Sequence, residues 1–124
     1  MSVFELTVSV SFSGAHFLRG YEGSCSQLHG HNFRVEVRVG GDQLNGLGML
    51  VDFKVIKQKV RSVIQKLDHQ TLNEMQAFRD TNPTAENIAR YIFGELAPAI
   101  NDAGARLVSI GVWETEGYGA VYTP

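Results

Sequence analysis

The sequence has a single cysteine, only three prolines and no excess of either charge. One cysteine cannot form a disulfide within the chain, so apolar packing must hold this 124-residue protein together. A formal net charge of -2 gives no general basis for binding nucleic acid or an anionic membrane. No apolar run reaches transmembrane length, and residues 1–12 lack the pattern of a signal peptide. These absences predict one domain, residues 1–124, in the reduced cytoplasm.

Apolar residues follow two different periods along the chain. Residues 4–12, 33–39, 108–112 and 118–122 alternate apolar and other residues, which predicts four strands. Residues 53–67 and 88–100 carry helical stripes, with Asp52 as the N-cap of the first helix and Asn82-Pro83 opening the second. The order ββααββ predicts an α+β fold with a four-stranded antiparallel sheet and two helices on one face. The exposed edges of such a sheet favour assembly into a homo-oligomer.

The residues that carry chemistry concentrate in residues 25–31, Cys-Ser-Gln-Leu-His-Gly-His. In an extended backbone His29 and His31 point the same way, because side chains alternate between faces. Their ring nitrogens can converge on one ion, and His16, after the first predicted strand, is the candidate third ligand. Three imidazoles that leave a fourth position open are typical of catalytic zinc sites. Isolated histidines at strand ends are usually solvated, but clustering with a cysteine favours a metal site.

The neighbouring thiol has two interpretations. Cys25 could close the metal site as a fourth ligand, or it could serve as a base or nucleophile, and a loop thiol beside a cation favours the second. Asp68 could hold the ring of His69 in one tautomer, so that His69 relays a proton to or from Cys25. Taken alone, an Asp-His pair after a helix is more often a cap or a turn.

A carboxylate near the end of the third predicted strand completes the set. Glu114 follows Val-Trp, and its two oxygens match the paired N–H donors of a guanidine-like heterocycle if it lies in a pocket. Glu116, in the turn that follows, is the competing candidate.

Taken together, these motifs resemble the 6-pyruvoyl-tetrahydropterin synthase and 6-carboxytetrahydropterin synthase family over nearly the whole chain. The resemblance rests on six motifs in the family's order, at residues 14–16, 25–33, 48–53, 67–73, 82–87 and 113–115. It implies the tunnelling fold (T-fold), in which subunits join their sheets into a barrel. It also implies a homohexamer built as a dimer of trimers.

The resemblance implies a role for each candidate residue. The three histidines would bind Zn²⁺, and Cys25 would be the proton-transferring base. Asp68 and His69, reaching the site from a neighbouring subunit, would complete a proton relay. A second set would contact the small-molecule substrate, a dihydropterin triphosphate. Its members are Glu114 on the amino-pyrimidine edge, with Thr84 and Glu86 near the ring. A triphosphate also needs cations, and the sequence does not choose among Arg19, Lys54 and other basic residues.

The spacing between thiol and histidines bears on the product. Three residues separate Cys25 from His29, which resembles the bacterial carboxy-forming enzyme of the queuosine (7-deazaguanine) pathway. That resemblance implies conversion of 7,8-dihydroneopterin triphosphate into 6-carboxy-5,6,7,8-tetrahydropterin, acetaldehyde and triphosphate. One alternative is 6-pyruvoyl-tetrahydropterin synthase, which acts on the same substrate and typically has a longer insertion at this point. Another is a non-catalytic zinc-binding module that Cys25 closes. A zinc hydrolase would leave the thiol and the Asp-His pair without a role.

Overall fold

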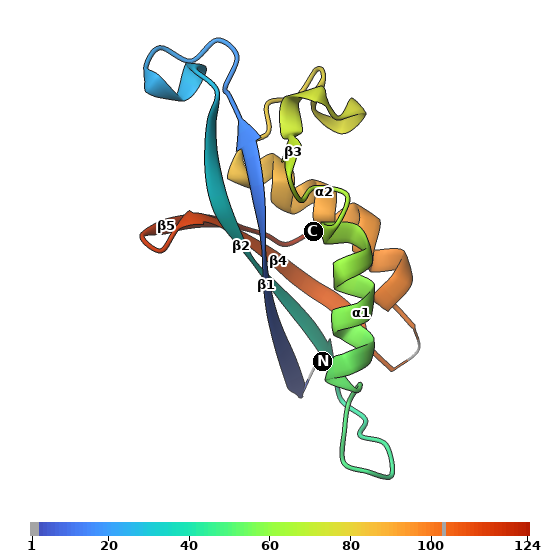
Figure 1. Ribbon diagram of the computed structural model, residues 1–124. Coiled ribbons are helices and arrows are strands. Elements are labelled where there is room, and N and C mark those ends of the chain that lie inside the picture. The colour runs from blue at the N-terminus through green and yellow to red at the C-terminus, as the bar shows by residue number, and fades with distance from the viewer. Residues whose placement is uncertain (1–2, 103) are drawn as a thin grey trace.

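The computed structural model describes residues 3–102 and 104–124 (Figure 1). The strands and helices follow in the order β1 (Phe4–His16), β2 (His29–Gly41), α1 (Phe53–Ile64), β3 (Gln70–Thr71), α2 (Ala85–Ile100), β4 (Arg106–Thr115) and β5 (Tyr118–Tyr122). Short 3₁₀ turns lie at Ser24–Ser26, Leu72–Glu74 and Gln76–Phe78. Within these described ranges, no helix is both long enough and apolar enough to cross a membrane.

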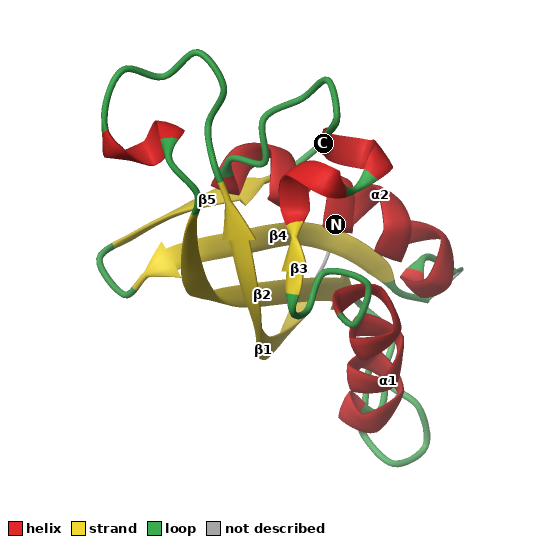
Figure 2. Ribbon diagram, turned by 45° about the horizontal axis from the view of Figure 1, so that its top comes forward, coloured by secondary structure: helices red, strands yellow, loops and turns green. Residues whose placement is uncertain are grey.

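The sheet has five strands in the order β3-β1-β2-β4-β5, and both helices pack on one of its faces (Figure 2). The predicted α+β class and its two helices are confirmed, but the predicted four-stranded antiparallel sheet is wrong. The additional strand, β3, runs parallel to β1 and pairs Gln70 with Gly14 and Thr71 with Ala15. The sheet is therefore mixed. Two paired residues give almost no periodic signal, which is why the sequence did not reveal this strand.

The hairpin of β1 and β2 is the longest feature of the sheet. Its residues pair in unbroken register, from Phe4 opposite Gly41 to His16 opposite His29. The alternating pattern ends at Phe12, yet β1 continues through Gly14, where a side chain would crowd the ring of Phe12 at 3.2 Å. Because the strand continues, His16 lies directly across from His29.

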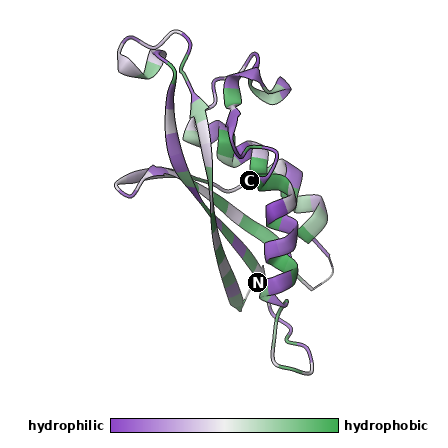
Figure 3. Ribbon diagram, viewed as in Figure 1, coloured by the Kyte–Doolittle hydropathy of each residue, from purple (hydrophilic) through white to green (hydrophobic). Residues whose placement is uncertain are grey.

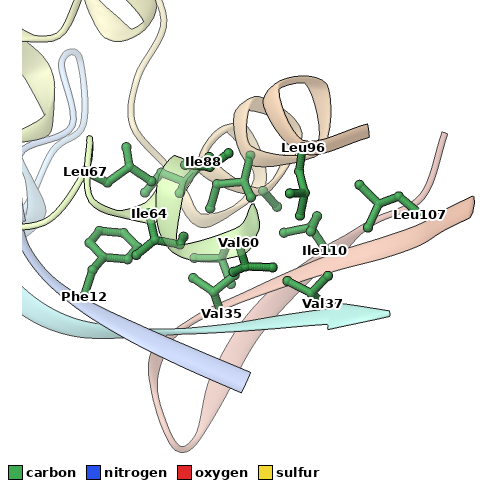
Figure 4. Close-up of a cluster of buried hydrophobic side chains, with 14 of the residues drawn as sticks. Phe12, Val35, Val37, Val60, Ile64, Leu67, Ile88, Leu96, Leu107 and Ile110 are labelled. Atoms are coloured by element: carbon green, nitrogen blue, oxygen red, sulfur yellow. The ribbon is translucent and has the colours of Figure 1, made fainter. Parts of the chain in front are cut away.

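The core lies between the sheet and the two helices. Figure 4 shows side chains from the strands meeting side chains from the helices in one cluster, which includes Phe12, Val35, Val37, Val60, Ile64, Ile88, Leu96 and Ile110. Burying each large side chain of this kind contributes about 1.5–3 kcal/mol. The side of α1 turned toward the viewer in Figure 3 is largely hydrophilic, so this helix is amphipathic.

The structure confirms the predicted start of α1 but not that of α2. Asp52 caps α1 as predicted, and its carboxylate accepts a hydrogen bond from the backbone N–H of Lys54 at 2.8 Å. The predicted start of α2 at Asn82-Pro83 is wrong, because the hydroxyl of Thr84 caps this helix by accepting the N–H of Asn87 at 3.1 Å. The helix predicted over residues 53–67 ends at Ile64.

Candidate active site

The strand register brings together the three histidines that the sequence singled out. His16, at the end of β1, lies opposite His29, and His31 lies opposite Gly14, where no side chain occupies the space. The ring centroids of His16 and His29 are 4.6 Å apart, and those of His29 and His31 are 4.9 Å apart. One ligand nitrogen from each ring lies within 4.8 Å of the other two. The cluster could therefore hold a metal ion.

Backbone carbonyl groups fix how two of these rings are turned. Nδ1 of His16 lies 2.7 Å from the carbonyl oxygen of Pro83, and Nδ1 of His29 lies 2.7 Å from that of Gln27. A carbonyl oxygen only accepts, so each Nδ1 donates and each Nε2 keeps a free lone pair. This is the usual way in which proteins orient a histidine that binds a metal.

Two ring nitrogen atoms of the cluster are the strongest indication that it holds a metal. Within the part of the chain that the structure describes, Nε2 of His16 and Nε2 of His31 are buried and have no hydrogen-bond partner. Burial lowers the pKa of His31, the neighbouring histidine rings lower it further, and the carboxylate of Glu114 opposes them. The lowered pKa favours the neutral ring, which is the form that binds a metal. The donor set fits a zinc ion with an open position.

The carboxylate of Glu114 faces the histidines. Its Oε1 lies 4.0 Å from Nε2 of His16, and its Oε2 lies 3.7 Å from Nε2 of His31. Val112 pairs with Val35 on the core face of the sheet, so Glu114, two residues further along β4, points the same way. Glu116 is exposed in the β4–β5 turn. Of the two candidate carboxylates, Glu114 is the one at the cluster.

The thiol lies in the loop between the histidine ligands. Cys25 belongs to the 3₁₀ turn Ser24–Ser26, its side chain is half-buried, and its carbonyl accepts the N–H of Leu18 at 2.8 Å. Among the described residues, the potential metal-binding group contains the three histidines without Cys25. This arrangement does not favour the thiol as a closing fourth ligand.

Asp68 and His69 form the expected pair. Oδ1 of Asp68 lies 3.1 Å from Nδ1 of His69, and it also accepts the backbone N–H of Ser13 at 2.9 Å. The Ser13 hydrogen bond is the main cause of the lowered pKa of Asp68, and His69 adds to it, so the carboxylate stays ionised. His69 has a positive φ of 58° and is 78% exposed.

The position of this pair leaves the relay incomplete within one chain. His69 and His31 both line a cleft of about 450 Å³ at the end of the hairpin beside β3. However, no hydrogen bond or ion pair among the described residues joins Asp68 or His69 to Cys25 or to the three histidines.

Two asparagines hold the chain after His16 through contacts that the sequence did not indicate. The side-chain amide of Asn73 accepts the N–H of Phe17 and donates to its carbonyl, both at 2.9 Å. The amide of Asn82 does the same for Arg19, at 2.9 and 3.0 Å. Local sequence patterns do not reveal hydrogen bonds between residues so far apart in the chain.

The remaining predicted residues lie where α2 begins. Thr84 caps the helix, directly after the carbonyl of Pro83 that orients His16, whereas Glu86 is exposed in the first turn.

A mixed sheet covered by two helices, with three convergent imidazoles at one end that could hold a metal ion, defines an α+β protein with a candidate metal site. Residues 5–124 match the family described as 6-pyruvoyl tetrahydropterin synthase. A solved 6-pyruvoyl tetrahydropterin synthase from Caenorhabditis elegans has a TM-score of 0.84 at 26% identity, covering 100% of this chain and 99% of that one. The chain belongs to the 6-pyruvoyl tetrahydropterin synthase family and is an enzyme of that family. The resemblance in the sequence motifs is thereby confirmed.

Relatives within the family have different names. The 6-carboxy-5,6,7,8-tetrahydropterin synthase of Bacillus subtilis is 34% identical over 128 residues, covering 98% of this chain and 86% of the relative. The dihydroneopterin monophosphate aldolase of Pyrococcus furiosus is 35% identical over 109 residues, covering 88% of each chain. Membership of the family therefore does not by itself identify the reaction.

Proposed function

We propose that this protein is a zinc-dependent 6-carboxy-5,6,7,8-tetrahydropterin synthase of the queuosine (7-deazaguanine) pathway. It would convert 7,8-dihydroneopterin triphosphate and one water molecule into 6-carboxy-5,6,7,8-tetrahydropterin, acetaldehyde and triphosphate. The observation that carries the proposal is the similarity to the Bacillus subtilis synthase over nearly the whole chain. The three residues between Cys25 and His29 support the same product.

The three histidines would hold the zinc ion through their Nε2 atoms, since Nδ1 of His16 and of His29 is already bound to a carbonyl. A zinc ion bound there supplies Lewis acidity to the hydroxyl groups of the substrate side chain. Cys25 would take and return protons as the base. The loop that carries it connects His16, at the end of β1, to His29, at the start of β2.

A neighbouring subunit would supply the Asp-His pair. His69 is exposed, and its partner Asp68 stays ionised and holds the ring by the Nδ1 side. The ring can then relay a proton through Nε2 to Cys25 of an adjacent copy. Two sheet edges are available for assembly, because β5 ends the sheet and β3 covers only Gly14 and Ala15 of β1. The assembly would be a homohexamer with a barrel of joined sheets.

Substrate contacts would come from residues around the cluster. Glu114 would accept two N–H groups of the pterin edge, with Thr84 and Glu86 near the ring. Arg19 is the better placed of the two candidate phosphate-binding cations within one chain, because it follows His16 by three residues and donates to the carbonyl of Asn73 at 3.3 Å. Lys54 belongs to the first turn of α1, and the start of that helix lies toward the end of the sheet opposite the β1–β2 loop (Figure 1).

A product assay combined with metal analysis tests the proposal. The protein is incubated with 7,8-dihydroneopterin triphosphate and, separately, with 7,8-dihydroneopterin monophosphate. The expected result is acetaldehyde and the carboxypterin from the triphosphate, with zinc bound. A diketo side chain on the product would identify a 6-pyruvoyl-tetrahydropterin synthase instead. Cleavage of the monophosphate alone would identify an aldolase.

Replacing the thiol separates an enzyme from a zinc-binding module. Cys25→Ala should abolish turnover and leave the zinc content unchanged, because the imidazoles suffice to hold the ion. Ser26→Ala, at the exposed neighbouring position, is the control and should keep both properties. Loss of zinc from Cys25→Ala would support the non-catalytic module in which the thiol closes the site.

A further inference from the structure

Helix α1 concentrates positive charge and has no carboxylate. Its basic residues are Lys54, Lys57, Lys59 and Arg61. The rest of the chain has seven basic and thirteen acidic residues, so this helix is the positive part of an acidic protein. Lys59 is engaged, because its ammonium donates to the carbonyl of Ala99 at 2.7 Å. Lys57 and Arg61 are exposed, and among residues 3–102 and 104–124 no ion pair or side-chain hydrogen bond engages either of them. Their charges are therefore available to an anionic ligand.

Lys57 and Arg61 line one side of a groove beside β1. They are four residues apart, as are Arg61 and Gln65, so all three side chains project from the same side of the helix. Residues 9–11 of β1 line the groove as well. Its volume of about 470 Å³ is within the range of small-molecule sites. Asp68 also lines this groove, and its carboxylate lies 3.1 Å from the ring of His69. The two cations and the Asp-His pair therefore belong to one surface of the molecule.

This surface lies where the proposed assembly brings in an adjacent copy. Apart from the two residues that β3 covers, the outer edge of β1 has no partner strand in the described part of the chain. Within the same ranges, no hydrogen bond or ion pair joins the Asp-His pair to Cys25 or to the three histidines. The copy whose thiol the pair serves must therefore approach this groove. The substrate bound by that copy comes with it.

A triphosphate group needs more cations than Arg19 alone supplies. Arginine binds phosphate oxygens through paired N–H groups and lysine binds them as a point charge, so the two residue types together suit a chain of phosphates. The acidic remainder of the protein repels a long polyanion such as a nucleic acid. A short phosphate chain is therefore the ligand that matches this groove.

We propose that Lys57 and Arg61 bind the triphosphate group of the substrate held at the site of an adjacent copy. The proposal rests on the proposed function, from which it takes the substrate and the assembly. Each site then draws on two copies. One copy supplies the histidines and Cys25, and the other supplies the Asp-His pair and the two cations. The amide of Gln65 donates a further hydrogen bond to the phosphate chain.

The first test removes both charges from the groove and measures turnover. The groove variant, Lys57→Gln with Arg61→Gln, is compared with wild type and with a control variant, Lys66→Gln with Arg106→Gln, which also loses one lysine and one arginine. Both control residues are exposed outside the groove, and Lys66 is paired with Glu95 at 3.2 Å. We expect the groove variant to raise the KM for 7,8-dihydroneopterin triphosphate by about tenfold or more, from two charge-assisted hydrogen bonds discounted for their exposure. Its kcat should stay within about twofold of wild type, since the lost contacts bind substrate and transition state alike. An unchanged KM, or the same rise in the control variant, would overturn the proposal.

Calorimetry with inorganic triphosphate gives a second readout that does not depend on turnover. The groove variant, purified with its metal, should bind inorganic triphosphate about tenfold or more weakly than the control variant, and equal binding would overturn the proposal. Any heat from extraction of the metal by triphosphate is common to both proteins. Circular dichroism shows whether the groove variant is folded. If it is not, Arg61→Gln alone replaces it, with an expected weakening of about threefold or more, and equal binding overturns the proposal in the same way.

Mixed assemblies show which copy supplies the cations. Cys25→Ala keeps Lys57 and Arg61 but lacks the thiol, and the groove variant keeps the thiol but lacks the cations. The two proteins are co-expressed with different affinity tags, and the assemblies that carry both tags are purified. We expect these assemblies to turn over substrate with the KM of wild type, because some sites combine Cys25 of one copy with the cations of the other. A KM that stays as high as in the groove variant, or failure to recover any mixed assembly, would overturn the shared site.

These outcomes separate the proposal from the proposed function. If the carboxypterin forms and the groove variant has the KM and the triphosphate affinity of wild type, the synthase assignment stands and the phosphate assignment fails. If the groove variant loses affinity for triphosphate but the wild type forms another product, only the synthase assignment fails.

Discussion

Replacing Asn73 by alanine should destabilise the protein much more than the same change at Asn82. Each side chain makes the same two hydrogen bonds to one backbone residue, Phe17 for Asn73 and Arg19 for Asn82. The difference is burial, because Asn73 is 5% exposed and its bonds are partly buried, whereas those of Asn82 are exposed. The two substitutions are therefore matched in chemistry and differ in access to water.

The magnitude follows from that difference. A hydrogen bond contributes about 0.5–1.5 kcal/mol net, and a buried group left without a partner costs about 1–3 kcal/mol. Asn73→Ala removes two hydrogen bonds and leaves the backbone N–H and carbonyl of Phe17 without partners. It should therefore lower the free energy of unfolding by about 2–4 kcal/mol. At Asn82 water can replace the lost bonds, which reduces the expected cost to about 1 kcal/mol or less.

Urea unfolding measures both variants, with metal removed and at one protein concentration, since subunit association would otherwise add to the apparent stability. Equal costs for Asn73→Ala and Asn82→Ala, or a cost below about 1 kcal/mol for Asn73→Ala, would refute the reasoning.

Three further variants test other parts of the structure. Gly119→Ala would place a Cβ 2.5 Å from the Trp113 ring and should lower the free energy of unfolding in urea by about 1–3 kcal/mol. The control Gly46→Ala, which has open space around it, should change that free energy by less than about 0.5 kcal/mol. Equal effects of the two substitutions would contradict the close approach of Gly119 to Trp113. Asp52→Ala removes the cap of α1 and should cost about 1 kcal/mol, and an unchanged unfolding midpoint would argue against the cap. Two backbone N–H groups lower the pKa of Asp102 in the folded protein, so its carboxylate stabilises the fold above the ordinary aspartate pKa and ceases to do so as pH falls through the lowered value. Asp102→Asn should therefore be less stable than wild type at pH 7 and approach it in acid, and a gap that widens in acid would show the opposite sign.

Long periodic segments of the fold were predictable from the sequence. The alternation in β1, β2, β4 and β5 and the helical stripes of α1 and α2 reflect the face that each element buries. The parts that sequence reasoning missed depend on distant contacts. β3 exists because Gln70 and Thr71 lie against the far end of β1. Asn82 and Thr84 are both good caps by residue type, and the contact between Asn82 and Arg19 leaves the cap to Thr84.

The candidate site was predictable where side-chain direction follows from strand period. That rule placed His29 beside His31, and in the structure it turns Glu114 toward His31. It could not reveal that the carbonyl of Pro83, 67 positions from His16, sets the ring orientation of that histidine. Nor could it choose between Glu114 and Glu116, because the choice depends on where β4 ends relative to β2.

The pairing of β1 with β2 has a consequence for folding as well as for chemistry. If β2 slipped by one residue along β1, His29 and His31 would turn to the other face and His16 would lose both neighbours. A slip of two residues would set His16 opposite His31 and carry His29 past the end of its partner strand. An ion bound by all three rings would stabilise only the native alignment. The gain in folding free energy would be about 2.7 kcal/mol when the ion concentration is a hundredfold above the dissociation constant. Binding of the ion would thus favour the native register of the hairpin as the chain folds, because only that alignment of the two thirteen-residue strands can bind it.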